Sequence, residues 1–154
     1  LKDYVAFYWD KMDAWYEEDE EIFVHPRDPY KRVDVLARSR HDRVMVAGET
    51  VADTRKPRLL FETLLPVHYC IPHEDVRMDL FVPSNKRTRC SYKGKAVYWS
   101  VKEKGQTVKD IVWSYLEPIP ECPKIRGMFC FFNERADAIY VDGEKMPTPD
   151  TIWS

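Results

Sequence analysis

The 154-residue chain contains 44% hydrophobic and 32% charged residues, a globular composition that excludes a disordered or fibrous protein and suits a single domain. The formal net charge of -2 provides no broad positive field, so no nucleic-acid partner is expected. No apolar run approaches the roughly 20 residues of a membrane-spanning helix, so no membrane partner is expected.

The first 25 residues resemble a segment near the other end of the chain. A shift of 124 positions lays residues 5–20 over residues 129–144, so that Phe7 matches Phe131 and Tyr16 matches Tyr140. We interpret residues 1–25 as C-terminal strands left from a first copy of a tandem repeat; the alternative is a chance likeness between two aromatic strands. An unpaired apolar strand recruits another strand, which predicts docking on the domain or a homodimer through residues 1–25.

Residues 26–40 are interpreted as a linker. They carry many charges together with Pro26 and Pro29, which disfavour a helix. A complete copy of the domain is expected over residues 41–146, followed by a tail over residues 147–154.

Strand signals dominate the domain. Residues 43–47 and 50–53 flank a turn at Gly48-Glu49 and predict a hairpin. Later apolar runs between turn residues predict strands over 58–63, 67–71, 96–102, 107–115, 128–132 and 138–141. One short helix is expected from Pro72 toward Leu80, ended by Pro83. The predicted fold is mainly β, an antiparallel folded sheet or small barrel with one short helix.

The cysteines carry no metal-binding pattern. Cys70, Cys90, Cys122 and Cys130 are scattered, without a Cys-x-x-Cys pair, so no metal is expected. Because Cys70 and Cys130 lie in apolar runs, we expect buried free thiols and a cytoplasmic setting, with disulfides as the alternative. Tyr92-Lys93-Gly94 lacks the long glycine-rich loop of a nucleotide site, and no cofactor is expected.

The densest group of aromatic and polar residues lies between residues 84 and 118. Aromatic walls with a few polar groups, beside a glycine that permits close backbone approach, are typical of a small-molecule pocket. The predicted ligand-binding residues, which include two from earlier strands, are Glu62, Tyr69, Thr88, Cys90, Tyr92, Lys93, Tyr98, Trp99, Trp113 and Tyr115.

Two tryptophans suggest an aromatic cage. Alternation along neighbouring strands predicts that Trp99 and Trp113 come together, forming a wall for a planar, cationic or sugar-like ligand. The alternative is an ordinary core filled by large rings.

Three residues are candidates for catalysis. Glu62 lies in an apolar strand and needs either a partner or an altered pKa, so it pairs structurally with Lys93 or an arginine, or serves as a general acid or base. In the enzyme hypothesis, Lys93 stabilises an anion and Cys90 is a nucleophile aided by His68 or His73. The structural alternatives are a solvated lysine in a turn and an inert buried thiol.

Four sequence blocks together carry a family resemblance. They are ETLLPVHYCIPHEDV at 62–76, TRCSYKGKAVYW at 88–99, WSYLEP at 113–118 and IRGMFCFF at 125–132. On these blocks the chain, from about residue 43 to 144, resembles the domain-of-unknown-function 427 family, sometimes labelled nucleotidyltransferase-like. The resemblance implies a compact β fold similar to tent-like folded sheets, and tandem copies, but no known reaction.

The leading hypothesis is a ligand-binding β module that takes a small molecule. A small enzyme built on Glu62, Lys93 and Cys90 is one alternative. The other is an interaction module that uses the N-terminal hairpin.

Overall fold

The computed structural model describes residues 3–152 and 154, and most of its regular structure is β-strand. Four 3-10 turns interrupt the strands, namely η1 Trp9–Lys11, η2 His73–Asp75, η3 Met78–Leu80 and η4 Pro123–Ile125. The strands in chain order are β1 Trp15–Glu17, β2 Glu20–Ile22, β3 Val33–Ala37, β4 Asp42–Val46, β5 Glu49–Thr54, β6 Arg58–Glu62, β7 His68–Ile71, β8 Phe81–Cys90, β9 Gly94–Glu103, β10 Gln106–Ser114, β11 Phe129–Phe131, β12 Ala138–Val141 and β13 Glu144–Lys145.

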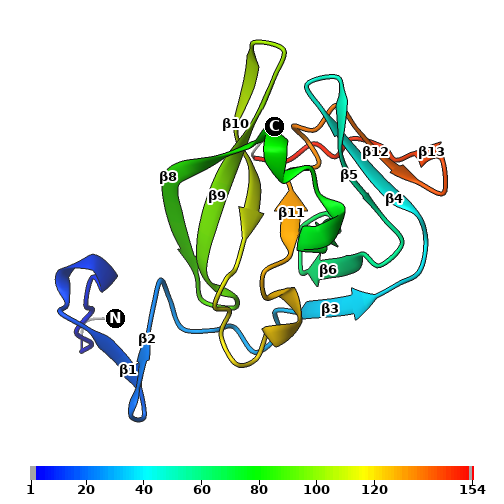
Figure 1. The fold of residues 1–154 in the computed structure, drawn as a ribbon. Helices are drawn as coiled ribbons and strands as arrows, with labels where there is room; N and C mark the ends of the chain where they lie inside the picture. Colours follow the sequence, from blue (N-terminus) through cyan, green and yellow to red (C-terminus); the bar gives the residue numbers. More distant parts are fainter. Residues whose placement is uncertain (1–2, 153) are drawn as a thin grey trace.

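The strands form three antiparallel sheets (Figure 1). The largest has seven strands in the order β3-β6-β7-β11-β10-β9-β8, and the second has four in the order β13-β12-β4-β5. The β1–β2 hairpin stands apart from both. No barrel closes within the described residues, so the mainly β, antiparallel folded sheet is confirmed and the small barrel is not.

Alternation of side chains along the strands builds the core on both faces of the large sheet. One cluster joins it to the four-stranded sheet and includes Val46, Ile71 and Phe131. Leu60 and Trp113, from β6 and β10, belong to a second cluster on the opposite face. Neighbouring residues of one strand, such as Val112 and Trp113, therefore belong to different clusters, as the period of two requires.

The predicted strands of two hairpins form with ends shifted by one or two residues. β4 and β5 meet at Ala47-Gly48, where both residues have positive φ, and β9 and β10 meet at Lys104-Gly105. Positive φ is a conformation that glycine adopts without a steric penalty, and Gly48, on which the first turn was predicted, occupies such a position.

The predicted short helix is wrong. Residues 73–80 instead form the 3-10 turns η2 and η3, separated by the extended residue Val76. Val76 makes an antiparallel bridge with Ala52, and the Arg77 amide donates to the Val51 carbonyl at 2.9 Å. Pairing with β5 thus holds the chain extended where a helix would have to continue.

No helix among the described residues has the length and apolar character needed to cross a membrane.

The range expected to be a linker contains a strand. β3 pairs with β6 from Val33↔Glu62 to Ala37↔Arg58 and forms one edge of the large sheet. The nearby prolines and charges give no local strand signal. The strand forms because β6, about 25 residues further along the chain, supplies its hydrogen bonds.

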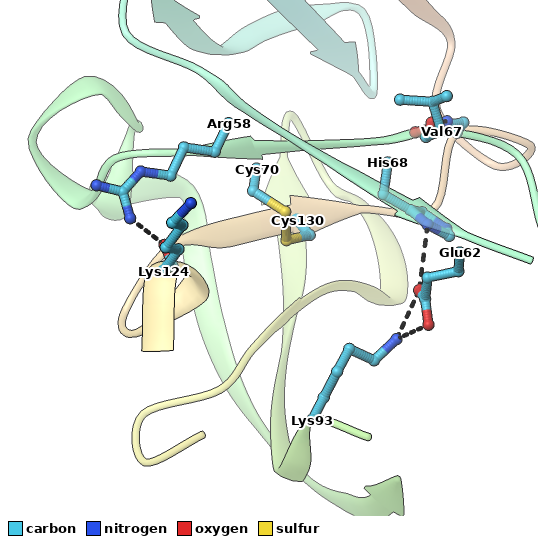
Figure 2. Close-up of a disulfide and its surroundings, with 9 residues drawn as sticks. Arg58, Glu62, Val67, His68, Cys70, Lys93, Lys124 and Cys130 are labelled. Atoms are coloured by element: carbon cyan, nitrogen blue, oxygen red, sulfur yellow. Dashed lines mark hydrogen bonds and ion pairs between the residues drawn. A yellow bond between two sulfur atoms is a disulfide. The ribbon is translucent and has the colours of Figure 1, made fainter. Parts of the chain in front are cut away.

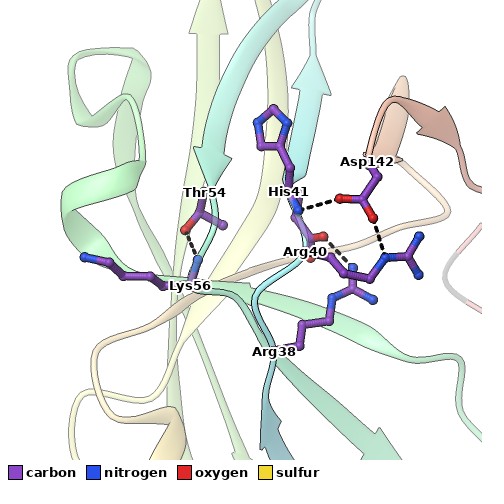
Figure 3. A network of polar contacts seen from close by, with 7 residues as sticks. Arg38, Arg40, His41, Thr54, Lys56 and Asp142 are labelled. Carbon is purple, nitrogen blue, oxygen red and sulfur yellow. Dashed lines mark hydrogen bonds and ion pairs between the residues drawn. The ribbon is translucent and has the colours of Figure 1, made fainter.

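Ion pairs fix the chain between β3 and β4. Arg38 bonds the fully buried carboxylate of Asp42. Arg40 donates to Asp142 at 2.6 Å, and the His41 amide donates to the same carboxylate at 2.9 Å (Figure 3). The β12–β13 turn is thereby tied to the start of β4.

Cys70 and Cys130 form a disulfide, so the expectation of free thiols is wrong for this pair (Figure 2). The two residues are direct partners across β7 and β11, with Cα atoms 4.3 Å apart. The sequence could not reveal that register. Cys90 and Cys122 are free. The cytoplasmic setting, inferred from reduced thiols, loses that support.

The N-terminal range contains the short strands β1 and β2, and most of its aromatic side chains are exposed. Tyr4 is 81% exposed and Tyr8 is 77% exposed, whereas the rings of Trp9 and Trp15 stack on each other. Residues 1 and 2 of this range lie outside the described residues, as does residue 153 of the expected tail.

Reduction of the Cys70–Cys130 disulfide should lower the free energy of unfolding by about 4 kcal/mol, because the bond closes a long loop and restricts the unfolded chain. The two cysteines are separated by 60 positions. Denaturant unfolding with and without a phosphine reductant measures this loss. A Cys90→Ala/Cys122→Ala variant should lose as much on reduction. Equal stability in both conditions, with four thiols open to alkylation without reductant, would contradict the disulfide.

Candidate functional site

A half-open cavity of about 360 Å³ lies beside the second core cluster. Strands β6, β7, β8, β9 and β10 of the large sheet contribute residues to its lining. The residues that line it are His25, Lys31, Glu62, Leu65, His68, Thr88, Cys90, Tyr92, Lys93, Tyr98, Trp113, Tyr115 and Phe132.

The structure brings together all but two of the residues predicted to bind a ligand. Those that line this one cavity are Glu62, Thr88, Cys90, Tyr92, Lys93, Tyr98, Trp113 and Tyr115. The three candidate catalytic residues are among them. The density of aromatic and polar types in the sequence was therefore a sound guide to which segments converge.

Trp99 and Tyr69 lie elsewhere. Trp99 pairs with Val112, and Tyr98 takes the position opposite Trp113, because a register shift separates Val108 from Val112. The Trp99 ring packs edge-on against Phe129 at 4.9 Å in the first core cluster, and Tyr69 lines a different cavity. The predicted Trp99–Trp113 cage is wrong, because periodicity within a strand does not specify register between strands.

A buried ion pair lies in the cavity wall. The Lys93 ammonium donates to both carboxylate oxygens of Glu62, at 2.6 and 2.5 Å (Figure 2). The Glu62 side chain is 5% exposed and that of Lys93 is 9% exposed. A buried charge requires a partner of opposite sign, so the predicted pairing of Glu62 with Lys93 is confirmed.

The turn before β9 positions Lys93. Its carbonyl accepts from the Ile119 amide at 3.1 Å, and Gly94 follows with φ +106°. A Cβ on Gly94 would meet the Glu117 carbonyl oxygen at 3.3 Å, so both conformation and space favour glycine here.

His68 is the polar group that sequence reasoning undervalued. The sequence indicates it only as a helper of Cys90, but its Nδ1 lies 3.9 Å from a Glu62 oxygen, too far for a hydrogen bond, and has no hydrogen-bond partner among the described residues. Desolvation lowers the His68 pKa, with the Lys93 charge acting in the same direction and Glu62 opposing it. The ring is therefore neutral near pH 7 and has an unfilled hydrogen-bonding position.

Aromatic rings surround the ion pair. The Lys93 ammonium lies 5.5 Å from the Trp113 ring centre and 5.8 Å from that of Tyr115, within cation-π range. Tyr98 and Thr88 share a hydroxyl hydrogen bond of 2.8 Å. Burial raises the pKa of both Tyr98 and Tyr115, which keeps these phenols neutral. The cavity thus combines apolar ring faces with a few polar positions.

The two free thiols differ in their surroundings. Cys90 is half-buried and lines the cavity, and its sulfur accepts from the Tyr92 amide at 3.5 Å. Burial raises the pKa of the Cys122 thiol, which keeps it protonated.

Across residues 3–152 and 154, no group of three or more His, Cys, Asp or Glu side chains is placed to hold a metal ion.

Sequence reasoning also missed four lining residues, namely His25, Lys31, Leu65 and Phe132. The first two belong to the range expected to end a repeat or form a linker, and nothing in their local pattern indicates a site. Phe132 stacks parallel to Tyr98 with ring centres 6.5 Å apart, a contact that depends on the fold.

Comparison with known proteins yields a family without an assigned activity. A family model described as "Domain of unknown function (DUF427)" matches residues 34–142. The match includes all of β3 but its first residue, and β3 precedes the segment that carries the motifs. None of the curated proteins matches the chain.

Lowering the pH from 7.5 to 5.5 should lower the free energy of unfolding. The ordinary histidine pKa is 6.5 and that of His68 is lowered, so below pH 6.5 the unfolded chain binds a proton that the folded chain excludes. The contribution of His68 to the free energy of unfolding is fully present above pH 6.5, the ordinary histidine pKa. It is lost as the pH falls below that value, by at most about 1.4 kcal/mol per pH unit.

Denaturant titrations across this range check the sign. His68→Gln should flatten the pH dependence, and the same substitution at exposed His73 is the matched control. Parallel curves for the wild type and His68→Gln would show that the His68 pKa is not lowered.

Proposed function

The chain belongs to the DUF427 family, and we propose that it binds a small planar molecule in the cavity around Glu62, Lys93 and His68. The observation that carries this proposal is a half-open space of about 360 Å³ lined by aromatic rings, by an ion pair and by buried His68, whose Nδ1 makes no hydrogen bond. Buried polar groups without partners are costly in a folded core. A ligand that bonds His68 satisfies this group.

The surrounding rings favour a flat ligand. Trp113, Tyr115, Tyr98 and Phe132 line the space, and stacked or edge-on contacts with such rings stabilise planar groups. Polar atoms at one edge of the ligand would reach His68, while its faces rest on the rings. This combination of apolar walls and a few convergent polar groups is typical of small-molecule sites.

An enzyme built on Glu62, Lys93 and Cys90 is the second candidate, favoured by the gathering of all three side chains at one cavity. The closed ion pair weighs against it, since the Glu62 carboxylate and Lys93 ammonium already bond each other at 2.5 Å. A general base or an anion stabiliser needs its charge directed at the substrate. We therefore favour binding over catalysis.

Indole-3-carboxamide, a neutral planar probe, should bind with a dissociation constant of about 1 mM or lower, because small ligands gain up to several tenths of a kcal/mol per atom in such pockets. Heteronuclear NMR titration reports this through the indole N–H signal of Trp113. Thr88→Trp, which fills the cavity, should abolish the shift. Thr107→Trp, at an exposed site of β10, is the matched control. An unmoved Trp113 signal at saturating probe would refute the proposal.

The N-terminal hairpin supports a separate proposal, that residues 3–22 repeat the hairpin that closes the domain. Under the 124-residue shift, Tyr16↔Glu21 corresponds to the pair Tyr140↔Lys145. Glu18 and Asp142, at equivalent turn positions, have φ of 51° and 50°. A tandem relationship between the two segments accounts for both agreements.

The repeat also suggests what the free edge of the hairpin binds. In the domain, β12 pairs with β13 on one side and with β4 on the other, whereas β1 pairs with β2 alone among the described residues. An unpaired edge beside exposed aromatic rings is a template for another strand. Two chains joined by their β1 edges would form a homodimer.

Light scattering should then report a dimer for the intact chain and a monomer for a variant lacking residues 1–22. Because residues 17–21 include four glutamates and one aspartate, repulsion between copies should weaken the dimer at low ionic strength, and salt should strengthen it. A monomer for both proteins at all salt concentrations would refute this association.

A further inference from the structure

The segment between β2 and β3 lies against the cavity. Residues 23–31, here named the strap, contribute His25 and Lys31 to the cavity lining. Both residues lie outside the region matched by the family model, which begins at residue 34.

Specific contacts hold the strap against the domain. The Ser91 hydroxyl donates to the Phe23 carbonyl at 2.9 Å, and the Asp28 amide donates to the Tyr92 hydroxyl at 2.7 Å. Ser91 and Tyr92, the domain residues in these two hydrogen bonds, belong to the turn that carries Lys93. The strap is therefore anchored to the same turn that builds the ion pair.

Two charged contacts secure the same segment. Arg27 pairs with Glu121 at 2.6 Å, and the Arg89 guanidinium lies 3.1 Å from the centre of the Phe23 ring. Because these contacts lie on both sides of His25, the position of the strap does not depend on the exposed β1–β2 hairpin.

Lys31 places an uncompensated positive charge at the cavity mouth. Its ammonium lies 5.9 Å from the centre of the Tyr92 ring, and within the described part of the chain it makes no ion pair. Glu62 is the single acidic residue among the described residues that line the cavity, and Lys93 neutralises it. Lys31 is thus the one charged residue of the lining without a carboxylate partner in that lining.

We propose that the strap makes the cavity selective for planar organic carboxylates, with Lys31 binding the carboxylate at the mouth. This inference rests on the proposed function, since the same ring-lined cavity receives the planar part of the ligand. A flat anion would lie between the rings with its negative group directed outward, toward Lys31. Lys31 is the one charged residue of the lining that has no carboxylate partner. Lys31 is then a specificity-determining residue supplied from outside the matched family region.

Two nearly isosteric probes separate charge from shape. Indole-3-carboxylate and indole-3-carboxamide differ mainly in charge, so their affinity ratio isolates the electrostatic contribution. For the intact chain at low ionic strength, the carboxylate should bind about fivefold more tightly, as expected for one partly exposed ion pair. NMR titration of the Trp113 indole signal measures both affinities at the site.

Lys31→Gln should remove the preference for the carboxylate and leave the affinity for the amide within about twofold of wild type. Lys145→Gln removes a lysine from the exposed strand β13 and should retain the full preference. Because Lys31 is exposed, its substitution should not disturb folding.

Each outcome bears on a different statement. If the amide binds but the carboxylate preference is absent in wild type or persists in Lys31→Gln, the role of Lys31 is refuted while the proposed function stands. If neither probe moves the Trp113 signal in any protein, the proposed function fails, and the inference fails with it.

Discussion

An inward-facing carboxylate in a β-sheet has to be paired, and much of the site follows from how this chain pairs Glu62. Its partner Lys93 is 31 positions away, in the turn before β9. Removing one member of such a buried pair commonly costs about 3–5 kcal/mol, because the other charge is left without compensation. The turn that delivers Lys93 needs Gly94 at φ +106°, close to the Glu117 carbonyl. One electrostatic requirement thus connects β6, the Lys93 turn and the segment after β10.

The cavity around this pair combines two parts of the chain. Residues 34–142, which match the family, supply the ion pair, His68 and the ring-lined walls. The strap supplies His25 and Lys31 at the mouth. The lining of the cavity is therefore shared between the family domain and the segment that precedes it.

The two similar hairpins show how far local sequence governs structure. Turn residues Glu18 and Asp142 adopt nearly the same φ, and the strand registers agree. Their surroundings differ, because Tyr140 lies under the Arg43 guanidinium at 4.7 Å, while Tyr16 is 61% exposed. The turn and register arise from neighbouring residues, whereas burial requires a third strand such as β4.

The same distinction explains which features could be predicted. Alternation and turn residues specify most strands, the mainly β class and the segments that meet at the cavity, because these signals arise from residues close together in the chain. Strand β3, the bridge at Val76, the Cys70–Cys130 disulfide and the pairing of Tyr98 with Trp113 were not predictable in this way. Each depends on which distant residues become neighbours, and a shift of one residue in strand register moves a side chain to the other face of the sheet. Long-range pairing therefore placed Trp113 in the cavity wall and Trp99 in the core.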